Sequence, residues 1–172
     1  MLSKERIDQL DDRTVLLILS YLSQDLREEL SDDQATSVRS ENEARQAISA
    51  LLNTVGALAA PVDTAEILPD DAAAVVVGRD LLKLLLEDEQ LRLRVEELIA
   101  DPPAETQMSV ELALAGAVVL GTLITWLQTK VDLRVSRKDG KIEFEIKLHK
   151  DATEASVIKD VVQSVKTLLL GP

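Results

Sequence analysis

The chain has 172 residues, 46% of them hydrophobic, which suits one ordinary domain or two small ones rather than a disordered segment. Its formal net charge of −12 argues against a nucleic-acid partner, because phosphate binding requires clustered Lys and Arg. The absence of cysteine excludes a disulfide framework, and the presence of only one Trp, one Tyr and one Phe predicts an aliphatic, mainly helical core.

The excess of acidic residues is concentrated in one part of the chain. The first 110 residues contain 23 of the 31 acidic residues and 10 of the 19 basic ones, whereas the remainder is nearly balanced. The beginning of the chain, "MLSKERIDQLDD", lacks the apolar run of a secretory signal. A cytoplasmic location is therefore expected.

Two amphipathic helices are predicted in the first 61 residues. Residues 10–30 carry one apolar stripe at helical spacing, and Asp11 stands where a helix cap belongs. The second helix opens at Ser40, followed three residues later by Glu43, the spacing of a capping box. Because only the polar loop "SDDQATSVRS" separates them, we expect an antiparallel helical hairpin, which forms an acidic domain over 1–61.

The segment "PVDTAEILP" over 61–69 is too rich in breakers for a long regular element and marks a boundary between this hairpin and a second unit, 70–172. Residues 72–77, an Ala and Val run, fit a strand or a helix equally well. A helix is predicted from Asp80 onward, where leucines recur at helical spacing, and 91–99 is ambiguous between the two periods.

The longest stretch without a charge is 112–129, and we expect it to form one long apolar helix. Its length is near the lower limit for crossing a bilayer, so it is either a buried helix or a membrane span. The basic residues that follow it make the membrane topology awkward, which favours a buried helix and leaves the membrane as the alternative location. Small side chains every fourth residue, together with a Trp, predict a helix-packing interaction face that also supports a homo-oligomer: Ala113, Ala117, Gly121, Thr125 and Trp126.

The final segment carries the most specific local signal, an Asp-Gly dipeptide typical of a tight hairpin turn. Pairing outward from Asp139 and Gly140 puts Val135 opposite Phe144 and Leu133 opposite Ile146 on one apolar face. The amphipathic segment that ends at Gly171 is expected to be a helix that covers this face. The fold class predicted from the sequence is therefore α+β: mostly helical, with an N-terminal helical hairpin, further helices, one long apolar helix and a C-terminal ββα unit.

Catalytic and metal sites are not indicated. His149 is the only histidine, so no ordinary transition-metal site or Ser-His-Asp triad has enough members. The acidic clusters lack the glycine turn of a calcium loop, and no phosphate-binding glycine-rich motif is present. We expect no enzymatic activity, no metal and no cofactor.

The order of elements resembles that of a known family. After "EDEQLRLRV" come the Pro-containing loop "ADPPAETQM", an Ala/Gly-rich apolar helix with "WL" near its end, a "DG" turn and a last helix. Over roughly 80–170 the chain resembles the effector-associated constant component of bacterial conflict systems. The resemblance implies a non-enzymatic adaptor that accompanies a protein effector or switch subunit in defence against phage. The alternative is a single-pass membrane-anchored or pore-forming effector component that uses helix 112–129.

Overall fold

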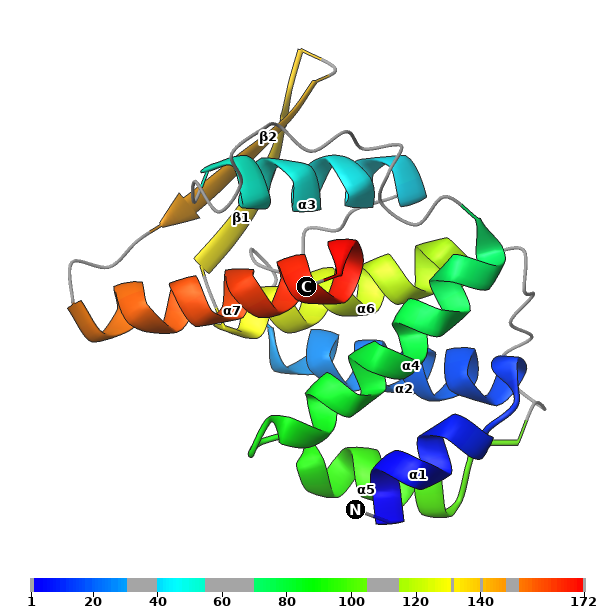
Figure 1. Cartoon of the computed structure of the whole chain (residues 1–172). Helices are drawn as coiled ribbons and strands as arrows, with labels where there is room; N and C mark the ends of the chain where they lie inside the picture. Colours follow the sequence, from blue (N-terminus) through cyan, green and yellow to red (C-terminus); the bar gives the residue numbers. More distant parts are fainter. Residues whose placement is uncertain are drawn as a thin grey trace.

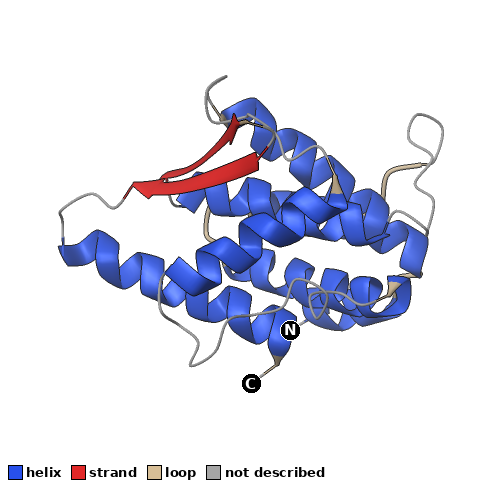
Figure 2. Cartoon of the chain, turned by 90° about the horizontal axis from the view of Figure 1, so that it is seen from above, coloured by secondary structure: helices blue, strands red, loops and turns tan. Residues whose placement is uncertain are grey.

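The computed structural model describes residues 2–30, 40–54, 70–104, 115–130, 132–139, 141–147 and 152–171. Within these ranges the fold is helical, with two short strands near the C-terminal end (Figures 1 and 2). The elements, in chain order, are α1 (Leu2–Gln9), α2 (Asp12–Glu29), α3 (Glu41–Thr54), α4 (Asp71–Glu87), α5 (Arg92–Ala100), α6 (Ala115–Lys130), β1 (Asp132–Lys138), β2 (Lys141–Lys147) and α7 (Ala152–Leu170).

Polar side chains cap the first turns of three helices. The Asp11 carboxylate accepts a hydrogen bond from the Thr14 N–H at 2.9 Å, and the Ser40 hydroxyl accepts one from the Glu43 N–H at 3.2 Å. Asp70 accepts from the Ala73 N–H at 2.7 Å, so the Ala and Val run over 72–77 belongs to helix α4. Each cap satisfies an N–H group that has no partner inside its own helix.

Helix α6 occupies the centre of the fold. It contacts α2, α3, α4, α7 and β1, and 11 of its 16 residues are buried. Figure 1 shows α3 on one side of α6 and α2 on the other, with α4 crossing in front. A helix that is apolar on every side must be covered on every side, and this requirement explains the central position of α6.

The expectation for 112–129 needs correction. Helix α6 begins at Ala115 and has 16 residues, while 111–114 lie outside the described residues. Among the helices that the structure describes, none combines the length and the apolar character needed to cross a membrane. The interpretation of a long apolar helix, and with it that of a transmembrane span, is therefore wrong for the described residues.

The N-terminal helical hairpin is also wrong. Helices α2 and α3 lie against different sides of α6 instead of forming a mutual packing surface (Figure 1). Two half-apolar helices that paired only with each other would leave α6 uncovered. One buried cluster consequently joins side chains from 1–61, such as Leu19 and Ile48, to side chains from 70–172, such as Leu123.

The expected α+β fold with a C-terminal ββα unit is likewise not what the structure contains. Strands β1 and β2 pair antiparallel with each other, with Leu133 opposite Ile146 and Val135 opposite Phe144, and Asp139 at the turn has a φ of 54°. They lie at one edge of the helices, where they contact α3 and α6 (Figure 2). Helix α7 contacts α3, α4 and α6 more extensively than it contacts either strand, so the three elements do not form a ββα unit.

Candidate functional site

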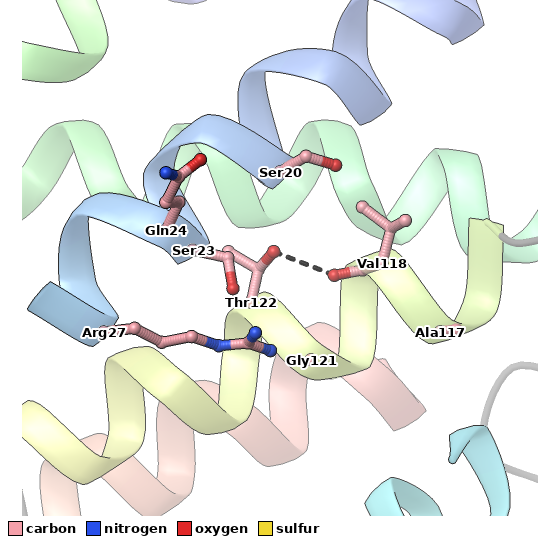
Figure 3. Close-up of a pocket in the computed structure, with 8 residues that line it drawn as sticks. All are labelled: Ser20, Ser23, Gln24, Arg27, Ala117, Val118, Gly121 and Thr122. Carbon is pink, nitrogen blue, oxygen red and sulfur yellow. Dashed lines mark hydrogen bonds between the residues drawn. The ribbon is translucent and has the colours of Figure 1, made fainter. Parts of the chain in front are cut away.

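A groove runs along the surface between α2 and α6 (Figure 3). Its volume is about 490 Å³, within the range of roughly 300–1,000 Å³ typical of ligand pockets. Helix α2 supplies mostly polar side chains to it and α6 supplies mostly small or apolar ones. The lining residues are Ser20, Ser23, Gln24, Arg27, Ala117, Val118, Gly121 and Thr122.

Gly121 leaves the α6 wall of the groove open. A Cβ atom placed on Gly121 would meet nothing within 4 Å outside its own helix. Gly78 of α4 is the opposite case, because a Cβ there would lie 3.2 Å from both Leu19 Cδ1 and Val119 Cγ2. Helix packing thus explains Gly78. Helix packing does not explain Gly121. A glycine inside a helix lowers stability by about 1 kcal/mol relative to alanine, so its presence there calls for another explanation.

Two hydroxyl groups of the groove are satisfied by backbone carbonyls. Ser20 Oγ donates to the Leu16 carbonyl at 2.9 Å, which is a bond within α2. Thr122 Oγ1 lies 2.8 Å from the Val118 carbonyl and 3.1 Å from the Leu19 carbonyl, so it ties α6 to α2 (Figure 3). The Thr122 hydroxyl therefore serves the packing of the two helices, and the Ser20 hydroxyl is satisfied within its own helix.

Ser23 and Arg27 have no such partners among the described residues. Ser23 as a residue is 8% exposed, and its hydroxyl makes no hydrogen bond to the described residues and points into the groove (Figure 3). The Arg27 guanidinium extends across the groove toward Gly121 and pairs with no carboxylate of the described residues. The two side chains lie one turn apart on α2, so they face the same way.

The interaction face predicted from the sequence is divided by the fold. Ala117 and Gly121 line the groove. Thr125 is 3% exposed and donates to the Gly121 carbonyl at 2.8 Å, and Trp126 is 4% exposed and faces α4. Ala113 lies outside the described residues. Self-association through the whole face stays a prediction.

Trp126 belongs to a polar cluster that sequence reasoning missed. Asp88 Oδ2, at the end of α4, accepts hydrogen bonds from Trp126 Nε1 at 2.9 Å and from Lys130 Nζ at 2.7 Å. Asp88 Oδ1 accepts from the Gln90 N–H at 3.0 Å. The Asp88 side chain is 6% exposed, so this bonding compensates a buried charge and fixes the α4–α5 turn against α6.

The ionisation of Asp88 follows from this bonding. Burial by itself raises the pKa of the carboxyl, but the hydrogen bonds from Lys130, from Trp126 and from the Gln90 backbone outweigh burial and lower the pKa below its usual value. The four-residue spacing of Trp126 and Lys130 was the only available signal in the sequence. Nothing local linked either residue to Asp88, 38 residues before Trp126.

A second groove, of about 390 Å³, lies between α4 and α7. Its charged side chains are already paired across helices: Lys83 lies 2.7 Å from Asp8, and Glu87 lies 2.7 Å from Lys4. These exposed ion pairs link α4 to α1 and leave little unsatisfied polarity for a ligand.

Metal chemistry finds no support in the part of the chain that the structure describes, which contains no group of three or more His, Cys, Asp or Glu side chains arranged to hold an ion. His149 lies outside that part.

The groove between α2 and α6, called the α2/α6 groove below, is accordingly the candidate binding site. Comparison with known proteins adds no assignment, because no family model, no curated protein and no solved structure matches this chain.

Proposed function

We propose that this chain is a non-enzymatic interaction protein that binds a protein partner through the α2/α6 groove. The observation that carries the proposal is Gly121, a helix-interior glycine whose missing side chain opens the groove and serves no packing contact within the described chain. A binding surface that accepts side chains of a partner protein would explain why a glycine stands at this position. The resemblance of 80–170 to companions of effectors in bacterial conflict systems supports the same class of function and suggests an effector or switch subunit as the partner.

The groove suits binding better than catalysis. Its serine and threonine hydroxyls have no histidine or carboxylate base beside them in the lining, and two of the three donate to backbone carbonyls. A nucleophile requires an adjacent base or a lowered pKa, and neither accompanies these hydroxyls. Shape and a few polar groups are what the groove offers to a ligand.

The test is co-purification of a tagged chain from its native host. Gly121→Leu fills the groove, and Val76→Leu is the matched control because Val76 is 60% exposed on α4, outside the groove. We expect one protein to be recovered with the natural chain and with Val76→Leu, and to be lost with Gly121→Leu. Equal recovery with both variants would exclude the groove as the binding surface. Turnover of a nucleotide, ester or peptide by the pure chain would contradict the non-enzymatic assignment.

A further inference from the structure

We propose that the partner presents a helical segment with one carboxylate beside an apolar side chain. In this arrangement Ser23 and Arg27 hold the carboxylate, and the apolar side chain lies over Ala117 and Gly121. The inference rests on the proposed function and deepens it, because it states the chemistry of the segment that the α2/α6 groove accepts.

The first argument is the state of Ser23. A serine hydroxyl that faces a groove and has no partner within the chain can donate to an acceptor supplied from outside. Ser23 is 8% exposed and has no partner among the described residues, whereas its neighbours Ser20 and Thr122 do. Its hydroxyl points into the groove (Figure 3), where an acceptor supplied from outside would satisfy it.

The second argument is the position of Arg27. Two other arginines are used within the chain: Arg79 lies 2.8 Å from Asp12, and Arg94 lies 2.7 Å from Asp25. The Arg27 guanidinium instead lies beside the open position at Gly121 (Figure 3). A guanidinium presents a planar fork of donors that matches a carboxylate, and the Ser23 hydroxyl adds a third donor on the same side.

The third argument is the arrangement of the two walls. Ser23 and Arg27 are four residues apart on α2, and Ala117 and Gly121 are four residues apart on α6. Both pairs therefore form rows along their helices. A helix that lies in the groove would direct a polar residue to the α2 row and an apolar residue to the α6 row, which is how amphipathic helices are recognised in grooves.

The overall charge favours a different protein over a second copy. At a net charge of −12, two copies repel each other, whereas a partner with a neutral or basic surface is not repelled. The groove thus selects a single carboxylate at short range from a segment that is otherwise apolar or basic.

The test uses helical 16-residue peptides selected by display on the natural chain, with affinity measured by fluorescence anisotropy. We expect the enriched peptides to share one Asp or Glu and an apolar residue on the same helical face. Arg27→Gln should weaken binding about tenfold and Ser23→Ala about threefold. Arg92→Gln is the matched control, because it removes the same charge from an exposed residue of α5 outside the groove and should change the affinity less than twofold.

The outcomes separate this inference from the proposed function. If Gly121→Leu abolishes peptide binding but Arg27→Gln has no effect, the groove binds protein and the carboxylate inference is wrong. If Gly121→Leu leaves binding intact, the groove is not the site and both proposals fail. A natural chain that forms a dimer by light scattering, and becomes a monomer on Gly121→Leu, would identify a second copy as the occupant and overturn the choice of a different partner.

Discussion

Replacing Gly78 and Gly121 by leucine should change the free energy of unfolding in opposite directions. Both glycines lie inside helices, so each substitution gains helix propensity, about 0.8 kcal/mol for leucine over glycine. The environments differ, because Gly121 faces open space and Gly78 faces Val15, Leu19 and Val119 at 3.2–3.4 Å from the position of a Cβ. The comparison therefore isolates packing from propensity.

The magnitudes follow from these distances. Gly121→Leu meets no atom at its Cβ, so we expect it to stabilise the chain by about 0.5–1 kcal/mol. A shift of this size raises the Tm of a chain of this length by about 1–4 °C. Gly78→Leu adds four carbons to a packed three-helix contact, where overpacking costs about 1–3 kcal/mol or more. After the propensity gain of about 0.8 kcal/mol, a net loss that reaches about 2 kcal/mol or more is expected.

The measurement is urea-induced unfolding followed by far-ultraviolet circular dichroism, with thermal unfolding as a second readout. Both variants should keep the m-value of the natural chain, because the change in exposed surface is small. Destabilisation by Gly121→Leu of more than about 1 kcal/mol would refute the reasoning, since it would mean that side chains of the folded chain already occupy the groove.

Two further predictions concern contacts that hold α6 in place. The low pKa of Asp88 means that its carboxylate contributes stability fully above the unfolded pKa of about 3.9, and that this contribution disappears as the pH falls through the lower folded value. In urea titrations the free energy of unfolding of Asp88→Asn should therefore be about 1–3 kcal/mol lower than that of the natural chain at pH 7, and it should change less with pH below 5. The control Asp101→Asn, at an exposed position, should resemble the natural chain. An unchanged pH dependence in Asp88→Asn would contradict this account. Thr122→Val removes the hydroxyl that bridges α6 to the Leu19 carbonyl and should lower the free energy of unfolding by about 1 kcal/mol. The control Ser164→Ala should lower it by less than about 0.5 kcal/mol, because its hydrogen bond to the Asp160 carbonyl is exposed and lies within α7. Equal losses would show that the bridge to α2 adds no stability.

Helix starts were the most predictable feature of the chain because their causes are local. Asp11 and Ser40 precede their helices in the sequence and cap them in the structure. The ambiguity over 72–77 had a local answer as well, since Asp70 caps the helix that includes this run. A cap requires only residues three positions apart, so sequence spacing is sufficient to find it.

The packing of the helices was not predictable in the same way. Consecutive amphipathic helices joined by a polar loop favour a hairpin, but α6 needs more cover than any single neighbour provides, and it separates α2 from α3. The apolar stripe of α7 likewise packs on helices, with Val162 and Val165 buried, while the strands contact α3 and α6. Periodicity identifies an apolar face without identifying its partner, so competition among several such faces is decided only in three dimensions.

The candidate site could be predicted from the sequence only in part, for the same reason. Small-residue spacing pointed to a face on α6, of which the fold leaves Ala117 and Gly121 in the groove and takes Thr125 and Trp126 into the core. Three departures from full use within the chain remain in the groove: a glycine that weakens its helix, a hydroxyl without a partner among the described residues, and an exposed arginine without a carboxylate there. Each departure lowers the stability of the isolated chain or contributes nothing to it. Under the proposed function their convergence on one surface has a common reason, because a segment that supplies a carboxylate and an apolar side chain would use all three together.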